Sequence, residues 1–417
     1  MRKKVLIRDP ILTRSGYGEH GRFVVRSLRS REDLFEIYIH PINWGHTGWL
    51  VDDDEERTWL DERITATATY GQQGGEFDMS IQVTIPNEWE LLAPVNIGVT
   101  AGIESTKVSP VWLEKANMMD KVITISEHSK GAFQNAAYEG QNRQTGQPMT
   151  LRCEKVPDVV GYPVKTFENL PDLNLSFDYD FNFLVVAQYG PRKNLENTIR
   201  WFVEENFDQK VGLVVKTFIK NNAKVDRMHT EQLVLNQISK FPDRKCKVYL
   251  IHGDMTDAEI HSLYKHPQIK CLVSATHGEG FGLPIFEAAY SGLPVMAPGW
   301  SGQCDFLYAP FQGTKKKGKK KGKHPYFAGI EYDIGPVQES AVWDGVVERD
   351  SMWCFPQEGS FKMRLRQVRK SYNKWKKKAD VLQKWILENF EEDKMYEKFV
   401  NSVGTKTDGL KYFKDLN

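Results

Sequence analysis

The chain has 417 residues, which is long enough for two domains that each bury a sizeable hydrophobic core. Its 56 Lys and Arg residues nearly balance its 55 Asp and Glu residues, so its overall charge does not attract it to nucleic acid, to a membrane or to any other charged partner. Hydrophobic residues make up 40% of the sequence and charged residues 27%, as is ordinary for a soluble globular protein.

Cysteine usage and the first residues both favour a reducing compartment. The five cysteines are an odd number, lie far apart and contain no Cys-x-x-Cys pair, which argues against a disulfide framework and against a zinc ribbon. The N-terminus leads directly into a strand pattern without the apolar core of a signal peptide, and no apolar run reaches the length of a membrane span. We therefore expect a cytoplasmic protein, located in the host cytoplasm if its source is viral.

The first half of the sequence alternates short apolar runs with helical or turn-rich segments. The runs predicted as strands are residues 5–7, 35–39, 79–85, 95–100 and 122–125. After the first run, Ser15-Gly-Tyr-Gly-Glu-His-Gly21 leads into a helical pattern. Strands that alternate with helices indicate a parallel sheet covered on both faces.

The same alternation is clearer in the second half. Strands are predicted at residues 183–187, 211–216, 248–251, 271–274 and 295–297. Helices are predicted at residues 194–202 and at 257–264, where Thr256 is the N-cap. A longer helix is predicted after the strand at 211–216, ending near residue 238, and another begins at Pro284. The predicted linker is the Pro- and Asp-containing stretch at residues 162–180. Two doubly wound domains of this kind are expected to bind ligands in a cleft at the carboxyl ends of their strands.

After residue 360 the pattern is helical, with apolar residues on one stripe and many basic residues between them. The basic residues are Lys362, Arg364, Arg366, Arg369, Lys370, Lys374, Lys376, Lys377 and Lys378. A helix that docks through its apolar stripe and exposes a solvated basic face is the simpler interpretation. The alternative is that these residues form part of a positive binding surface.

The most informative segment is Glu279-Gly-Phe-Gly-Leu-Pro-Ile-Phe-Glu287, which follows a predicted strand and opens a predicted helix. Its glycine-rich turn would gather backbone N–H groups around an anion at the helix N-terminus. The two glutamates add acceptors for hydroxyl groups, so the segment suits a ligand with both phosphate and sugar parts. Capping of the helix, or complementation of its dipole, is the alternative use of such carboxylates.

Four segments of the second half resemble, in order, the landmarks of a large group of GT-B glycosyltransferases. They are residues 185–195 with an Arg-Lys pair, 213–217, 248–264, and 279–287 with the Glu-x7-Glu signature. In the first half, residues 16–21 resemble the family's N-terminal glycine loop, and residues 123–130 resemble its strand and helix start near the cleft. The group is the retaining, glycogen-synthase-like one, similar to glycosyltransferase family 4.

The resemblance implies an α/β protein of the GT-B fold. This fold has two doubly wound Rossmann-like domains that face each other across a cleft, and a C-terminal helix that packs back on the N-terminal domain. The expected boundaries are residues 1–165 for the acceptor-side domain, 180–360 for the nucleotide-sugar-binding domain and 361–417 for the C-terminal helical segment. Residues 306–360 match no general pattern of the family.

The family's residue roles carry over onto the matching positions. Glu287 is expected to bind the ribose hydroxyls of a nucleotide sugar, and Glu279 the hydroxyls of the transferred sugar. Arg192 and Lys193 would neutralise the diphosphate leaving group, because fixed cations stabilise charge that develops on phosphate oxygens. The other residues expected to bind the donor are Gly280, Phe281, Gly282, Met255, Gly16 and Gly18.

The resemblance also implies that the anomeric configuration is retained and that the donor is a UDP- or GDP-linked sugar, with no separate cofactor. The Arg192-Lys193 pair removes the need for a metal ion, so no metal is predicted. The acidic run at residues 52–56 contains an Asp-x-Asp pattern typical of metal sites in another glycosyltransferase fold. It lies in a polar stretch with no buried strand before it, so a solvated charge run is the preferred interpretation.

Three further residues are candidates for the acceptor side. Glu104 and His128 could position the acceptor or the sugar, and Trp44 could stack on a sugar or a base. A surface position, a helix cap and core packing are the respective structural alternatives. For Gly16 and Gly18, a tight turn is the alternative to donor contact.

A run of seven lysines falls within residues 313–324, inserted after the predicted donor-site helix. These lysines are Lys315, Lys316, Lys317, Lys319, Lys320, Lys321 and Lys323. A solvated loop is one interpretation, and salt-sensitive attraction to a polyanion is the other. On the second interpretation the acceptor is DNA that bears a hydroxymethylated base, as for the DNA-modifying glycosyltransferases of bacteriophages, and the base would be extruded to react.

Two other functions remain open at this point. The acceptor could be a cell-surface glycan or a lipid-linked sugar, since basic patches also meet anionic lipids. The chain could also be a catalytically silent GT-B scaffold that binds polyanions, although the intact Glu279, Glu287, Arg192 and Lys193 argue against this. We expect no stable insertion into a membrane.

Overall fold

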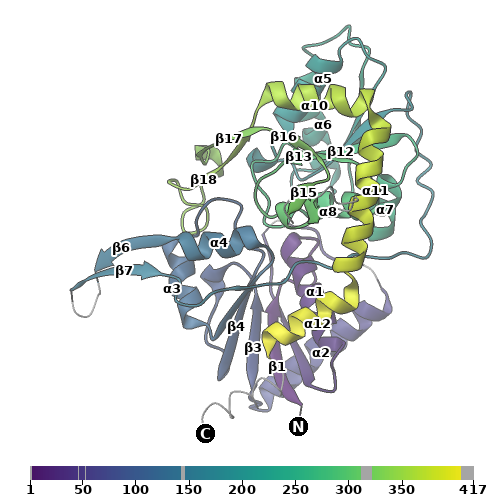
Figure 1. Ribbon diagram of the computed structural model, residues 1–417. Helices are drawn as coiled ribbons and strands as arrows, with labels where there is room; N and C mark the ends of the chain where they lie inside the picture. Colours follow the sequence, from purple (N-terminus) through teal and green to yellow (C-terminus); the bar gives the residue numbers. More distant parts are fainter. Residues whose placement is uncertain (1, 46, 52, 142–145, 311–321, 405–417) are drawn as a thin grey trace, which may run out of the picture. The chain divides into compact units, whose positions relative to one another are not determined.

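The computed structural model describes residues 2–45, 47–51, 53–141, 146–310 and 322–404. The chain forms two compact units, which are described separately (Figure 1). The described residues of the N-terminal unit fall within Met1–Pro163, Val342–Ser351 and Phe390–Asn417; those of the C-terminal unit fall within Val164–Ala341 and Met352–Asn389. Each unit contains one six-stranded parallel sheet with helices, which confirms the predicted α/β class.

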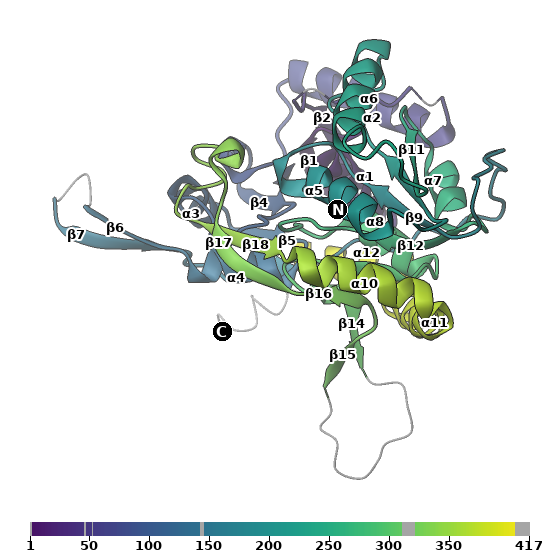
Figure 2. The same cartoon turned by 90° about the horizontal axis from the view of Figure 1, so that it is seen from above.

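The sheet of the N-terminal unit has the strand order β2-β1-β3-β4-β5-β8. Its strands are β1 (Lys3–Asp9), β2 (Phe35–Pro41), β3 (Met79–Val83), β4 (Val95–Thr100), β5 (Lys121–Thr124) and β8 (Asp158–Val159). Its helices are α1 (Gly16–Arg29), α2 (Glu55–Gln72), η1 (Pro86–Glu88), α3 (Pro110–Met118), α4 (Glu127–Asn135) and α12 (Glu392–Val403). The antiparallel hairpin of β6 (Ala137–Gln141) and β7 (Pro148–Arg152) extends away from this sheet (Figure 2).

The glycines at the start of α1 allow this helix to lie close to the end of β1. A Cβ atom at Gly18 would lie 2.2 Å from the carbonyl oxygen of Thr13, and one at Gly21 would lie 2.1 Å from Oδ2 of Asp9. Gly16, by contrast, has open space where a Cβ atom would be. Close packing therefore explains Gly18 and Gly21 without any ligand. The tight turn proposed as the alternative for Gly16 and Gly18 is not present, because both residues lie in α1 and neither has a positive φ.

Asp9 is a fully buried carboxyl group at the end of β1, below α1. Burial raises its pKa to about 7, although Arg22 acts in the opposite direction. In the unfolded chain Asp9 has the ordinary pKa of an aspartate, 3.8. Between this pKa and the folded pKa of about 7, the folded state therefore binds more protons than the unfolded state. Stability contributed by this group is therefore present at low pH and declines as pH rises through the folded pKa.

Replacing Asp9 with asparagine is expected to flatten this part of the pH profile. Between about pH 4 and pH 8, the free energy of unfolding of the wild type should fall by about 2–4 kcal/mol more than that of Asp9→Asn, because asparagine does not ionise. Denaturant unfolding at a series of pH values measures this difference, and the same replacement at the exposed Asp344 is the control. Parallel profiles for Asp9→Asn and the wild type would show that Asp9 does not titrate in this way.

The sheet of the C-terminal unit has the strand order β11-β10-β9-β12-β13-β16. Its strands are β9 (Asn182–Val186), β10 (Gly212–Lys216), β11 (Lys247–Ile251), β12 (Ile269–Val273), β13 (Val295–Pro298) and β16 (Ala328–Ile330). Its helices are η2 (Pro191–Lys193), α5 (Leu195–Asn206), α6 (Lys224–Ile238), α7 (Asp257–Tyr264), α8 (Leu283–Tyr290), α9 (Cys304–Leu307), η3 (Glu339–Ala341), α10 (Glu358–Lys370) and α11 (Tyr372–Asn389). β9 lies in the middle, so its carboxyl end is flanked by those of β10 and β12.

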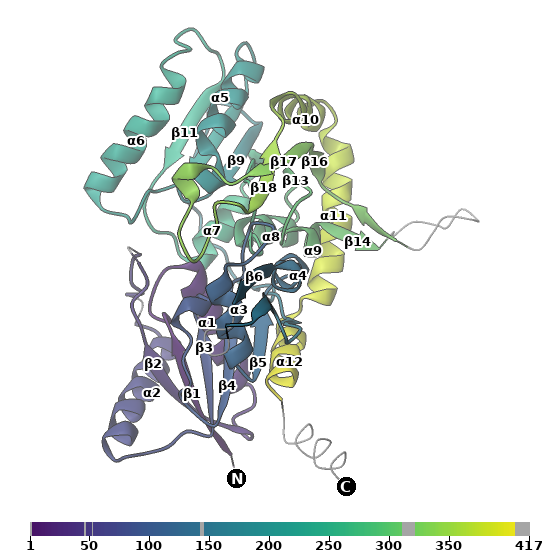
Figure 3. The ribbon, with the colours of Figure 1, turned by 90° about the vertical axis from the view of Figure 1, so that its left-hand side faces the viewer.

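The described residues within 306–360, a range for which no pattern was found, include short strands around the sixth strand of this sheet. The hairpins are β14 (Tyr308–Pro310) with β15 (Lys323–Pro325), and β17 (Tyr332–Pro336) with β18 (Met352–Pro356). Strands of three residues, such as β14 and β15, carry too little periodicity to be recognised in a sequence. Figure 3 shows β14 beside α11, and β17 and β18 beside α10.

The expected domain boundaries differ from the two units at three places, of which the C-terminal helices are the third. Residues 342–351, expected within the second domain, pack in the N-terminal unit, where the carbonyl oxygen of Gly345 accepts hydrogen bonds from Asn87 and Ser109. Val346 is buried in the same hydrophobic cluster as α3. The expected linker at 162–180 has no helix or strand, but most of it belongs to the C-terminal unit.

The C-terminal helices divide between the two units. α12 packs on α1, where the rings of Phe399 and Phe23 lie 5.6 Å apart, so the expected contact of the last helix with the N-terminal domain is confirmed. α10 packs on α5, with Phe361, Leu365 and Val368 fully buried, as the docking interpretation predicted. Within the described part of the chain, no helix combines the length and apolar character that crossing a membrane requires.

Candidate nucleotide-sugar site

The centre of the candidate site is the buried carboxylate of Glu279, in the loop between β12 and α8. Its side chain is 8% exposed and accepts hydrogen bonds from two cations. Nζ of Lys193 lies 2.6 Å from Oε1 and 2.8 Å from Oε2, and Nη1 of Arg192 lies 3.0 Å from Oε2. The structure therefore brings together the three residues that the sequence assigned to catalysis.

The three groups form one charged cluster with a net positive charge. Burial opposes ionisation of Glu279, but the Lys193 ammonium and the Arg192 guanidinium outweigh it and lower the pKa of the carboxyl group to about 2. One negative charge thus faces two positive charges at neutral pH. The surplus charge favours an additional anion near these cations.

The backbone holds the two loops that carry this cluster together. The short helix η2 follows β9, and Asn194 ends it in the left-handed region with a φ of 53°. The Asn194 side chain donates to the carbonyl oxygen of Ala275, and the backbone N–H of His277 donates to that of Arg192. Arg192 also donates to the carbonyl oxygen of Gly278 at 2.7 Å. The cations and the glutamate are thus fixed relative to each other by several hydrogen bonds.

A second loop supports the glycine turn from its other side. The backbone N–H of Glu279 donates to Oγ of Ser301 at 2.8 Å, and the N–H of Gly302 donates to the carbonyl oxygen of Glu279 at 2.9 Å. Ser301 has a φ of 66°, which is uncommon for a residue with a side chain. A Cβ atom at Gly302 would lie only 1.9 Å from the carbonyl oxygen of Gly280. Neither Ser301 nor Gly302 was predicted from the sequence.

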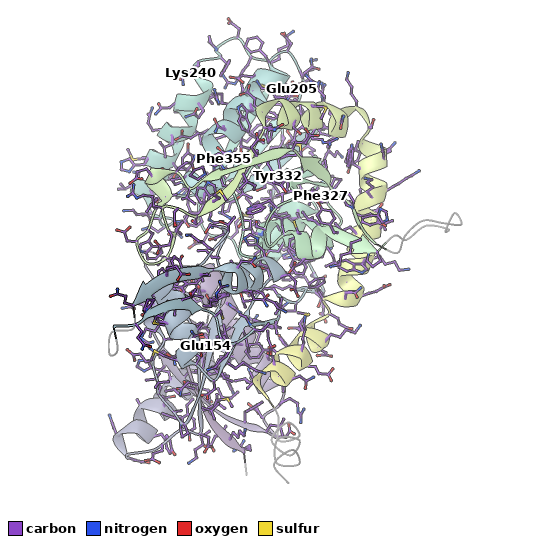
Figure 4. The ribbon with its side chains drawn as sticks, turned by 60° about the vertical axis from the view of Figure 1, so that its left-hand side comes forward. Glu154, Glu205, Lys240, Phe327, Tyr332 and Phe355 are labelled. Carbon is purple, nitrogen blue, oxygen red and sulfur yellow. The ribbon has the colours of Figure 1, made fainter. Side chains whose placement is uncertain are left out.

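The strand β18 contacts the same loop through His277, which was also not predicted. The backbone N–H of Cys354 donates to the carbonyl oxygen of His277, and Nδ1–H of His277 donates to the carbonyl oxygen of Cys354 at 2.7 Å. The ring of His277 lies between those of Trp353 and Phe355, and Figure 4 labels Phe355 in this hairpin. Burial lowers the pKa of His277, so its ring is a neutral spacer rather than a charge.

The second glutamate lies on α8 and is oriented by a buried tyrosine. Gly282, with a φ of 94°, is the N-cap of α8, and Glu287 lies in the next turns of this helix. The Tyr264 hydroxyl donates to Oε2 of Glu287 at 3.0 Å, and burial raises the pKa of Tyr264 well above its ordinary value. Tyr264 therefore stays a hydrogen-bond donor and fixes the orientation of the Glu287 carboxylate.

The remaining donor-binding candidates of this unit have different environments. Phe281 is buried against Phe286 and Phe306, so its side chain belongs to the core and only its backbone is available for a ligand. Met255 is half-buried in the loop between β11 and α7. In the neighbouring loop, Lys216 at the end of β10 donates to the carbonyl oxygen of Gly253 at 2.6 Å, and burial lowers its pKa.

The candidates in the N-terminal unit lie near the carboxyl ends of its strands, but some have structural partners. Nε2–H of His128 donates to the carbonyl oxygen of Ser105 at 3.0 Å, and burial lowers its pKa. The N-cap of α4 is Ser126, so His128 is not the helix cap that the structural alternative proposed. The ring of Trp44 lies 4.5 Å from that of Tyr17 and is half-buried beside the core. Glu104 is half-buried in the loop between β4 and α3.

The acidic run next to α2 serves local structure where it is described. Asp54 is the N-cap of α2 and accepts from the backbone N–H of Arg57, while Glu56 pairs with Arg26 at 2.5 Å. These contacts agree with a role in helix capping and surface ion pairs. No cluster of three or more His, Cys, Asp and Glu suited to a metal ion occurs among the residues that the structure describes.

Most of the lysine run lies outside the described residues. This holds for Lys315, Lys316, Lys317, Lys319, Lys320 and Lys321. Lys323 is described and is exposed at the start of β15. The structure thus gives the point at which the run joins the C-terminal unit.

The fold is shared with solved structures of glycosyltransferases. HepE from Anabaena, solved in complex with UDP and glucose, is 15% identical, and the match covers 96% of this chain and 99% of that one with a TM-score of 0.59. A glycosyltransferase from Rickettsia africae is 12% identical over 97% of this chain and 99% of that one, with a TM-score of 0.59. Sucrose-phosphate synthase from Thermosynechococcus elongatus is 12% identical over 95% and 97%, with a TM-score of 0.57.

The sequence itself matches no protein-family model and no curated protein. At these identities the structural similarities establish the fold and not the activity. Together with two six-stranded parallel sheets, they show that the chain has the GT-B fold.

Proposed function

We propose that this protein is a glycosyltransferase that moves a sugar from a nucleotide-sugar donor to a hydroxyl group of an acceptor. The observation that carries this proposal is the buried cluster of Glu279, Lys193 and Arg192, which holds a surplus positive charge beside a glycine turn. The cluster follows β9 and β12, at the carboxyl ends of the strands of a doubly wound sheet, which is where such folds bind ligands. HepE, which shares the fold, was solved with UDP-glucose.

Arg192 and Lys193 are proposed to bind the diphosphate of the donor. As the glycosidic bond breaks, the nucleoside diphosphate gains negative charge, and cations that are already in place stabilise it without reorganisation. Glu279 keeps both cations in position before the donor binds. In the complex, it is proposed to accept hydrogen bonds from hydroxyls of the transferred sugar.

Glu287 is proposed to bind the ribose hydroxyls, with its carboxylate oriented by Tyr264. The backbone N–H groups of Gly280, Phe281 and Gly282 are proposed to approach the donor, and the half-buried Met255 to line the base pocket. In the N-terminal unit, Gly16 keeps its proposed donor role, since a Cβ atom there would meet no neighbouring residue within 4 Å and packing alone does not explain the glycine. Gly18 has its own packing role and would contribute only through its backbone.

The donor chemistry in this proposal uses charged side chains in place of a divalent cation. Retention of the anomeric configuration follows from the resemblance to the Glu-x7-Glu group, and no nucleophile is assigned. UDP- and GDP-linked sugars are the proposed donors.

The acceptor is proposed to be DNA that carries a hydroxymethylated base, as in a bacteriophage modification system. The support is the run of seven lysines within nine residues, which favours a polyanion. Glu104 and Trp44 remain acceptor-side candidates, while the hydrogen bond of His128 makes its role there a positioning one. A glycan or lipid-linked acceptor, and a silent polyanion-binding scaffold, are the alternatives.

Replacing Glu287 with alanine is expected to abolish stabilisation by the donor. A nucleotide sugar present at about 100 times its Kd should stabilise the wild-type protein by about 2.7 kcal/mol, because it binds only the folded state. Thermal-shift measurements with a panel of UDP- and GDP-sugars test this. Glu287→Ala should lose most of the shift, whereas Glu231→Ala, at an exposed position on α6, should keep it. A full shift in Glu287→Ala would show that the donor binds elsewhere.

A further inference from the structure

Two sets of basic residues on α10 and α11 differ in their surroundings. The first set is neutralised by two glutamates of α5: Lys362 lies 2.6 Å from Glu204 and Arg366 lies 2.8 Å from Glu205, which Figure 4 labels beside α10. Lys362 also pairs with Glu358 within α10. These residues hold α10 against α5 and have little charge left for a partner.

The second set consists of Arg364, Lys374 and Lys378, which we term the cation cluster. None of them forms an ion pair with a described residue. Nζ of Lys378 lies 5.0 Å from the ring centroid of Trp375, and Nζ of Lys374 lies 5.9 Å from it. Arg364 donates to the carbonyl oxygen of Gly329 and to Gln367, both of which are neutral. The cluster therefore gathers three positive charges with no carboxylate among them.

Holding three cations together in this way is unfavourable without an anion. Partial burial lowers the pKa of Lys378, and the charges of Lys374 and Arg364 lower it further. An anion placed against the cluster would remove this repulsion.

The cluster adjoins the strand from which the lysine run continues. Nζ of Lys378 lies 3.5 Å from the carbonyl oxygen of Pro325 in β15, and Lys323 is exposed at the other end of this strand. Figure 3 shows β14, the partner of β15, beside α11. Along the sequence, Lys323 is the last of seven lysines in residues 315–323. This number of charges exceeds what one phosphate group can neutralise and suits a polymer of phosphates.

The same region lacks the features of a surface that inserts into lipid. Among the described residues of β14, β15, α10 and α11, the one large apolar side chain that is exposed is Leu387, at 39%, near the end of α11. Membrane-binding helices of this basic type present exposed aromatic or aliphatic residues beside their lysines. A soluble polyanion therefore fits the surface better than a bilayer.

We propose that the cation cluster is a docking surface for the phosphate backbone of a nucleic acid. The cluster would contact phosphates on a fixed part of the C-terminal unit, and the contact would be independent of base sequence. This proposal concerns the acceptor side of the proposed function. It rests on that function only for the claim that the bound nucleic acid is the molecule that receives the sugar. Binding to the cluster does not require the donor site to work.

The test is the affinity for a fluorescent DNA duplex at several salt concentrations, measured by anisotropy. Lys374→Gln/Lys378→Gln is expected to weaken binding at least about tenfold near 100 mM salt and to reduce the slope of log K against log salt by about 2. Lys240→Gln/Lys384→Gln removes the same charge from exposed positions at the end of α6 and on α11. This control should bind within about twofold of the wild type.

Equal losses in the two double variants, or no loss in either, would overturn the proposal. Displacement of the duplex by pyrophosphate at equal ionic strength would assign the cluster to a small phosphate ligand instead. Binding to anionic vesicles that depends on Lys374 and Lys378, without binding to DNA, would assign it to a membrane. The thermal shift with a nucleotide sugar should persist in Lys374→Gln/Lys378→Gln, so failure of this inference is distinguishable from failure of the donor site.

Discussion

Replacing Lys193 with methionine is expected to lower turnover of the nucleotide sugar by about 10²–10³-fold, the usual effect of removing one charge that stabilises a developing anion. The side chain of Lys193 is 17% exposed and makes the shortest contact with Glu279. Methionine keeps the length and removes the ammonium. The diphosphate would then face Arg192 alone, and with Glu279 the cluster would have no surplus positive charge.

The rate of nucleoside diphosphate release, measured with the nucleotide sugar that gives the largest thermal shift, tests this expectation. Lys240→Met is the matched control, since Lys240 is exposed at the far end of α6 (Figure 4). The control should retain wild-type turnover. A Lys193→Met protein that folds and turns over at the wild-type rate would remove Lys193 from the mechanism.

Replacing Gly302 with alanine is expected to be the most destabilising single change at the site. The added Cβ atom would lie 1.9 Å from the carbonyl oxygen of Gly280 and 2.9 Å from that of Glu279, and neither backbone atom can move without displacing the glycine turn. We expect a loss of about 2–3 kcal/mol in the free energy of unfolding, as for other overpacked sites. Donor binding should fall with it, because the turn carries Glu279.

The control for this change is Gly359→Ala. Gly359 lies in the first turn of α10, and a Cβ atom added there would meet no neighbouring residue within 4 Å. Alanine at this position should be neutral or stabilising by up to about 1 kcal/mol. Thermal unfolding of the two variants, each with and without nucleotide sugar, makes the comparison. A Gly302→Ala protein with an unchanged melting temperature and an unchanged ligand shift would contradict the described contact.

The donor-side elements could be predicted because local sequence determines them. Buried parallel strands such as β9 and β12 are mostly apolar, and the turn between Glu279 and Glu287 carries its own glycines and proline. The Arg192-Lys193 pair lies in the short connection after β9, so it had to emerge at the carboxyl ends of the strands, as does the glutamate loop after β12. For these residues, position along the chain implies position in space.

The supporting contacts could not be predicted, because they join segments that are distant in sequence. Ser301 and Gly302 resemble any serine and glycine after a strand, and only the structure places them against Glu279. His277 meets Cys354 across 77 residues of sequence. Short strands such as β16 have no periodicity, so the sixth strand of the sheet was missed for the same reason.

Charge was the least reliable guide in the sequence, since a list of basic residues does not reveal which ones are already paired. Lys362 and Arg364 lie two positions apart, yet only Lys362 has carboxylate partners. Glycine was ambiguous in the same way. Gly16 has open space around it and Gly18 is confined by Thr13, although both belong to one motif.

A crystal structure with the nucleotide sugar that stabilises the protein most would test the central proposal directly. We expect the diphosphate oxygens within about 3 Å of the Arg192 guanidinium and the Lys193 ammonium, and the ribose hydroxyls within about 3 Å of the Glu287 carboxylate. A nucleotide bound away from these three side chains, with the contacts of Glu279 unchanged, would contradict the assignment of the donor site.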